Sequence, residues 1–220
     1  MAHGRGVLGR FYGYDGYHSD RNRLRQIGSG FFVRLSVSAT FFCAADAVRF
    51  GALAVYAVET AATPLWCAGG YACLTLASAL GAALAPVLSR RIGLIRLVSV
   101  AAGLSALVHC VVFFTGGKSS GLLFLALAAI SVLSGTMPTV CNVLVASFVD
   151  RHGGAQAGRV FAVWGVTGKV GNGLGVLAMS IVLSIFPGAK GALFSLSFVP
   201  ALFLLALPMF LHGERRHFSP

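Results

Sequence analysis

Three ionisable side chains, Asp46, Arg49 and Lys169, lie deep inside long apolar stretches of the chain. At bilayer depth such groups cost roughly 2.5–3.5 kcal/mol each on insertion scales, and they mark ion or substrate pathways by default. Asp46 and Arg49 are three residues apart, and in a helix this spacing puts both on one face, where they can form an ion pair. The pattern therefore indicates a polar pathway across a membrane.

Lys169 lies on a small and polar helical face, with Gly165 and Gly173 one turn to either side and Asn172 three residues on. Small residues allow a second helix to approach closely, so this face is expected to meet protein or a cavity rather than lipid. Because Asp46 has Arg49 beside it, one positive charge is left in excess at mid-depth. An acid on another polypeptide, an anionic substrate or loss of the lysine's proton on desolvation would each balance it. An Asp46–Lys169 ion pair is the structural alternative.

A polar segment, Ser-Gly-Thr-Met-Pro, ends at Pro138 inside the fourth apolar stretch. Proline removes a backbone hydrogen bond, so the segment predicts a helix break near mid-membrane, and interrupted spans of transporters line the binding cavity. A proline kink satisfied by neighbouring hydroxyls is the alternative. Trp164 either stacks on a substrate ring or packs at the interface. The candidate substrate- or cation-binding residues are Lys169, Asp46, Arg49, Asn142, Asn172 and Trp164.

Six apolar stretches must position these residues. With 57% hydrophobic and 10% charged residues, the chain is too apolar for a soluble globule. About 20 apolar residues span a bilayer, and lipid cannot hydrogen-bond the backbone, so each span must be a helix. The sequence predicts an all-α membrane protein with a six-helix transmembrane bundle, its spans at roughly 31–58, 64–88, 95–115, 121–149, 160–186 and 191–212.

Basic residues predict the orientation, because Lys and Arg are enriched in cytoplasmic loops. They concentrate before the first span, after the second and fourth spans and in the tail. Both termini are therefore expected in the cytoplasm, at the plasma (inner) membrane. The predicted divisions are a basic, Gly- and Tyr-rich lead at 1–29, the bundle at 30–213 and a tail at 214–220.

Other functional classes find no support in the composition. The formal net charge is +11, but the basic residues flank the spans, where they meet anionic lipid rather than nucleic acid. Five cysteines lie inside spans without a C-x-x-C pair, so neither a disulfide nor a metal site is expected. No nucleophile has a histidine base at the required place, and His109 is expected to be a packing residue. The sequence predicts no enzyme and no cofactor, with Na⁺ or H⁺ as a possible coupling cation.

The segment from Pro138 to Gly188 carries a family resemblance. It reads PTVCNVLVASFVDRHGGAQAGRVFAVWGVTGKVGNGLGVLAMSIVLSIFPG. It resembles the tenth and eleventh helices of the melibiose permease-like glycoside–pentoside–hexuronide:cation symporters, which belong to the major facilitator superfamily. Asp150 matches the second acid of that pattern, Arg159 the loop arginine and Lys169 the central lysine. Ser147 stands in place of the first acid, and Arg90 replaces the acid of another superfamily loop.

The resemblance implies that the chain is the C-terminal half of a twelve-helix transporter. In the family the central lysine lies near cation-binding acids of the N-terminal half, and this chain lacks those acids. A second six-helix half or a second copy of the chain is therefore an expected partner, beside membrane lipid and a small-molecule solute. The resemblance also implies a cytoplasmic gate made of Asp150, Arg151, Arg159, Arg90 and Arg91.

The expected function is thus a secondary active transporter, or half of one, that carries a sugar-like or other small polar solute with a cation. Two alternatives stay open. One is a truncated half that does not transport and acts as an assembly or regulatory membrane subunit. The other is a lipid or lysolipid carrier, because relatives of the symporter family include such carriers.

Overall fold

The computed structural model describes residues 29–115, 120–152 and 157–212, all but a few connecting residues of which are helical. The predicted cytoplasmic lead and tail lie outside these residues. The six helices agree with the predicted spans to within a few residues, and all six are long and apolar enough to cross a membrane. They are α3 (Ser29–Glu59), α4 (Pro64–Ile92), α5 (Leu94–Thr115), α6 (Ser120–His152), α7 (Ala157–Ile185) and α8 (Ala189–His212).

Local sequence explains where several helices begin and end. Thr63 caps α4, since its hydroxyl accepts a hydrogen bond from the backbone N–H of Trp66, and Pro64 follows at the first helical position, where no N–H is needed. Gly93 ends α4 with φ at 82°, a conformation that glycine adopts without strain. This single glycine is enough to turn the chain from α4 into α5.

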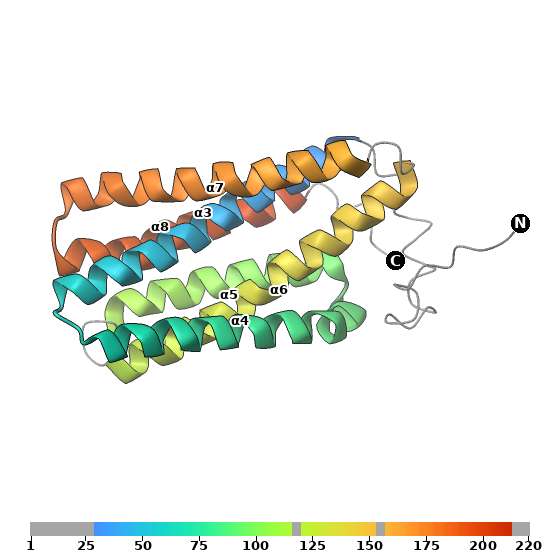
Figure 1. Ribbon diagram of the computed structural model, residues 1–220. Coiled ribbons are helices and arrows are strands. Elements are labelled where there is room, and N and C mark those ends of the chain that lie inside the picture. The colour runs from blue at the N-terminus through green and yellow to red at the C-terminus, as the bar shows by residue number, and fades with distance from the viewer. Residues whose placement is uncertain (1–28, 116–119, 153–156, 213–220) are drawn as a thin grey trace, which may run out of the picture.

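The helices pack in the order α7, α3, α8, α5, α6, α4, so that α7 and α4 form the two edges of the bundle (Figure 1). Each edge helix packs mainly against one neighbour, α7 against α3 and α4 against α6. In the most apolar windows of α7 and α4 only 11% and 17% of the residues are buried, against half or more in α5, α6 and α8. If α3–α5 and α6–α8 are taken as two repeats, the second helix of each lies at an edge beside the first helix of the other, and the two third helices meet in the middle. This arrangement matches two inverted three-helix repeats.

Glycines allow both edge helices to approach their neighbours closely. A Cβ on Gly81 of α4 would lie 1.9 Å from the carbonyl oxygen of Val132, and one on Gly135 of α6 would lie 2.0 Å from that of Ser78. At the other edge, a Cβ on Gly175 of α7 would lie 2.4 Å from the carbonyl oxygen of Ala44. Since no side chain fits at these distances, glycine sets the spacing at both crossings.

The predicted helix break at Pro138 is wrong, because α6 continues through this residue as one helix. Two hydroxyls bond to carbonyls on this stretch. Thr136 donates to the carbonyl of Leu133 at 2.7 Å, and Thr139 donates to that of Gly135 at 3.3 Å. Pro138 removes the helical donor for the carbonyl of Ser134, and these hydroxyls bond to the carbonyls on either side of it.

Candidate functional site

A buried polar cluster joins α3 to α6 in the interior of the bundle. Arg49 is only 2% exposed, and its Nη2 donates to Oδ1 of Asp46 on the preceding turn of α3. Its Nη1 donates to Oγ of Ser134 on α6 at 3.1 Å. The guanidinium carbon also lies 4.9 Å from the centroid of the Phe50 ring, in cation–π range. The predicted Asp46–Arg49 pair is therefore formed.

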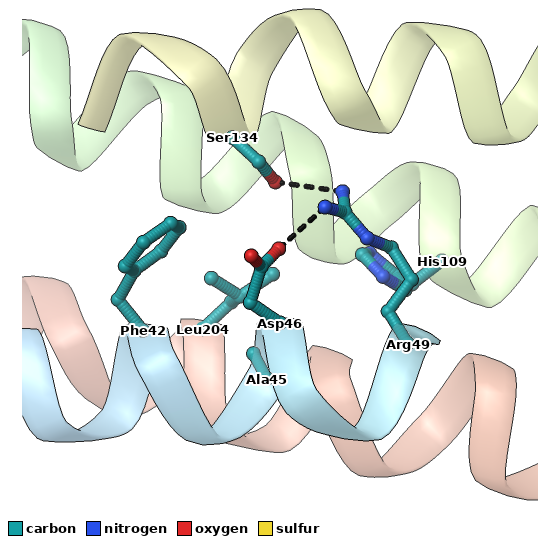
Figure 2. A pocket seen from close by; sticks show the side chains of 7 residues that line it. All are labelled: Phe42, Ala45, Asp46, Arg49, His109, Ser134 and Leu204. Atoms are coloured by element: carbon teal, nitrogen blue, oxygen red, sulfur yellow. Dashed lines mark hydrogen bonds and ion pairs between the residues drawn. The ribbon is translucent and has the colours of Figure 1, made fainter. Parts of the chain in front are cut away.

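His109 of α5 lies against the same cluster (Figure 2). Its ring is 1% exposed, and Nδ1 is 2.7 Å from the carbonyl oxygen of Ser105. A carbonyl only accepts, so Nδ1 carries the proton and Nε2 presents a lone pair. Neither Nε2 of His109 nor Nε of Arg49 has a partner among the described residues.

The crevice between these groups is lined by polar and apolar side chains together. It has no room for a water molecule and therefore none for a solute in this conformation. Asp46 is the most accessible of its three ionisable groups, because one third of its side chain is exposed while Arg49 and His109 are sealed. The lining residues are Phe42, Ala45, Asp46, Arg49, His109, Ser134 and Leu204.

Lys169 lies on the outer side of α7, away from this cluster. Gly171 and Gly175 face α3, and Lys169 precedes Gly171 by two residues, which is about 200° around the helix. The side chain is exposed and has no hydrogen bond or ion pair with another described residue. The alternative of an Asp46–Lys169 pair is wrong in this structure, since Asp46 pairs with Arg49.

The outer side of α7 also carries the other polar residue predicted near Lys169. Asn172 is exposed, and a Cβ added to Gly165 or Gly173 would meet nothing within 4 Å. Lys169 lies twelve residues after Ala157 in a helix of 29 residues, hence close to mid-membrane. Lipid cannot solvate an ammonium at that depth, so this face requires a protein or an aqueous neighbour.

Asn142 of α6 and Trp164 of α7 meet directly. Trp164 donates from Nε1 to Oδ1 of Asn142 at 3.0 Å. These two helices otherwise make few contacts, so the bond bridges a sparsely packed junction. Asn142 is exposed and Trp164 is half-buried, and an exposed amide beside an indole offers polar and stacking contacts to a ligand.

The residues predicted as a cytoplasmic gate all belong to the same end of the bundle, around the α4–α5 and α6–α7 connections (Figure 1). Asp150, Arg159, Arg90 and Arg91 are exposed, and the side chain of Arg151 lies outside the described residues. Within the described part of the chain, no ion pair links Asp150 to the arginines. The gate remains a prediction.

Comparison with known proteins identifies the family. Residues 22–211 match the family model described as MFS/sugar transport protein. The chain belongs to this family. No curated protein and no solved structure matches the chain. The family covers the glycoside–pentoside–hexuronide symporters, which confirms the resemblance, and it is a family of transporters rather than enzymes.

Family membership makes the chain a multi-pass membrane protein of the sugar-transport branch of the superfamily, with a small-molecule solute.

Two members of the buried cluster were not predicted from the sequence as parts of a site. Ser134 was assigned to a helix break, and His109 was treated as a packing residue. The sequence signal for both was weak, because each is a lone polar residue in an apolar span and nothing in its spacing names its partner on another helix.

Proposed function

We propose that the chain is one half of a cation-coupled symporter for a small, polar, sugar-like solute. The observation that carries the proposal is Lys169, which has no partner among the described residues and is exposed near the middle of α7, on the face turned away from the bundle. A mid-membrane ammonium in this setting requires an anionic partner or a water-filled cavity. A partner half with intramembrane carboxylates would supply both, and those carboxylates would hold the coupling cation, Na⁺ or H⁺.

Solute would bind where the open side of this half meets the partner. Asn142 and Asn172 would donate and accept hydrogen bonds with hydroxyl groups, and Trp164 would stack on an apolar ring face. Asp46 would present its partly exposed carboxylate from α3, with Arg49 behind it. The gate residues at the cytoplasmic end would pair and separate as the two halves rock against each other.

Edge packing supports the need for a second half. The mostly unburied helices α4 and α7 flank the side that such a half would cover. A six-helix bundle alone does not enclose a cavity that opens alternately to the two sides of the membrane. A second copy of this chain would bring two Lys169 side chains to the interface, whereas Asp46 of each copy is already paired with Arg49, so charge favours a different, acid-bearing half.

Transport by reconstituted protein tests the proposal. The chain is placed in liposomes, alone and with a co-expressed six-helix half, and uptake of labelled sugars is followed under an imposed Na⁺ or H⁺ gradient. Gradient-driven uptake is expected with the partner, and Lys169→Ala should abolish the cation dependence. Lys190→Ala is the matched control, because Lys190 is an exposed lysine at the start of α8.

Each result has a definite meaning. Cation-dependent uptake that persists in Lys169→Ala contradicts the role of the lysine. Uptake by the chain alone removes the need for a different half. Absence of uptake with and without the partner contradicts transport of this class and leaves the non-transporting subunit, whereas movement of labelled lysolipid in place of sugar would identify a lipid carrier.

A further inference from the structure

Two atoms of the buried cluster have no hydrogen-bond partner among the described residues, and they are complementary to each other. Nε of Arg49 is a hydrogen-bond donor, and Nε2 of His109 is an acceptor, because Nδ1 of the same ring already donates to Ser105. Both side chains line one crevice and are almost fully buried. Buried polar atoms without partners destabilise a fold, so a donor and an acceptor that both lack partners in one crevice require an explanation.

The charge on Asp46 explains why the two atoms are apart in this conformation. Arg49 directs Nη2 to the carboxylate and Nη1 to Ser134. Figure 2 shows the Asp46 carboxylate bonded to the end of the Arg49 side chain and the His109 ring next to the same side chain. A charged acceptor holds a guanidinium more strongly than a neutral lone pair does, so the arginine turns to Asp46 while that group is ionised.

We propose that Arg49 is a two-position switch, bonded to Asp46 while that carboxylate is charged and to Nε2 of His109 once a positive charge neutralises it. Ser134 holds the guanidinium at its far end in both positions. A buried guanidinium that lost its charged partner would be strongly destabilised, and the lone pair of His109 is an acceptor that the lining of the crevice offers in exchange. His109 is thereby a positioning residue for Arg49.

The difference in exposure determines which group meets a positive charge first. Asp46 is 33% exposed, so a cation or a proton that arrives from outside this six-helix bundle reaches Asp46 before the buried Arg49 and His109. The second position would tie α3 to α5, two helices that make almost no contact in the described part of the chain. Neutralisation of one carboxylate would thus redistribute the bonds among α3, α5 and α6. The inference relies on the proposed function only for the source of the positive charge.

A stability cycle on the purified chain tests the switch without any transport assay. Asp46→Asn stands for the neutralised carboxylate. In that background His109→Leu removes the second acceptor. The resulting rise in the unfolding equilibrium constant should be at least tenfold larger than the rise that His109→Leu causes in the chain with Asp46 intact. His109→Gln, whose amide oxygen offers an acceptor near the Nε2 position, should restore the constant to within about twofold.

The matched control removes the arginine. In a background of Asp46→Asn with Arg49→Met, His109→Leu and His109→Gln should act alike, because no guanidinium needs an acceptor. An equal effect of His109→Leu in the presence and absence of the Asp46 charge overturns the proposal, and so does failure of His109→Gln to rescue. A merely structural histidine would give these results.

A spectroscopic measurement serves if Asp46→Asn does not fold. Asp46, Arg49 and His109 are the ionisable groups among the described residues that line the crevice. The ¹⁵N resonance of His109 Nε2, assigned with His109→Gln, is followed in the wild-type chain as the pH is lowered. A change of its chemical shift from the value of a free lone pair to that of a hydrogen-bonded lone pair supports the switch. An unchanged chemical shift, or the chemical shift of a protonated ring, overturns it.

Discussion

Two mid-membrane charge sites of this chain are built in opposite ways. The Asp46–Arg49 pair on α3 is formed within the chain and is tied to Ser134 of α6 in the core. Lys169 on α7 lies at a similar depth, since a Cβ on the adjacent Gly168 would lie 3.9 Å from Sγ of Cys43, one turn before Asp46. However, Lys169 faces outward and has no partner among the described residues.

This contrast separates two uses of charge in a membrane. A buried pair couples helices, and removing one member strands the other in a low-dielectric interior. An exposed, unpaired lysine contributes nothing to the fold of the chain that carries it, and its cost is recovered only when a partner or an aqueous cavity covers it. The first site is therefore expected to govern stability, and the second to govern activity.

Arg49→Met should have the largest effect on stability. The substitution leaves Asp46 without its counterion in a partly buried position, at a cost of about 3–5 kcal/mol in the free energy of unfolding. Denaturant titration of the purified chain in detergent, followed by circular dichroism, measures this cost.

The double variant Asp46→Leu with Arg49→Met is the control for that experiment. It replaces both charges with apolar groups, and exchange of a buried pair for well-packed apolar residues is often neutral or stabilising. It should regain most of the lost stability. A double variant as unstable as Arg49→Met would mean that the packing of the arginine, rather than the unpaired charge, is what matters.

The α3–α7 crossing determines that Lys169 points outward, and Gly175→Ala should disturb it. The added Cβ would lie 2.4 Å from the carbonyl oxygen of Ala44, so the two helices must separate, at about 1–3 kcal/mol. Gly173→Ala, on the outward side of the same helix, meets nothing within 4 Å and should stabilise by up to about 1 kcal/mol through helix propensity. Thermal unfolding of the two variants side by side gives the comparison, and equal shifts would contradict the close crossing.

The sequence predicted the spans well and the site only in part, for a physical reason. Hydrophobicity and length determine the spans, and the Asp46–Arg49 pair follows from spacing within one helix. The bonds from Arg49 to Ser134 and from Trp164 to Asn142 join different helices. The sequence of an apolar helix does not indicate which residues of another helix it will contact, so only the packed structure reveals these bonds. The break predicted at Pro138 was wrong because a single proline can lie inside a helix that continues on both sides of it, as in α6.

The hydrogen bond between Trp164 and Asn142 should contribute a smaller amount. Asn142→Leu and Trp164→Phe each remove it, and a double-mutant cycle should give a coupling of about 0.5–1.5 kcal/mol, the usual net value for one hydrogen bond. Unfolding of all four proteins of the cycle is followed by circular dichroism, because Trp164→Phe removes one of the two tryptophans and with it part of the fluorescence signal. A coupling of zero would show that the two residues act independently of each other.

Lys169→Met should leave the stability of the isolated chain within about 0.5 kcal/mol of wild type, the range usual for substitutions away from any specific contact. The reason is that the ammonium has no partner among the described residues, so its removal leaves no charged group without a counterion. Unfolding is measured under the conditions used for Arg49→Met. A loss approaching that of Arg49→Met would reveal a counterion for Lys169 within this chain and remove the main argument for an acid-bearing second half. Unchanged stability, combined with lost cation dependence in the reconstituted transporter, would assign the lysine to activity alone.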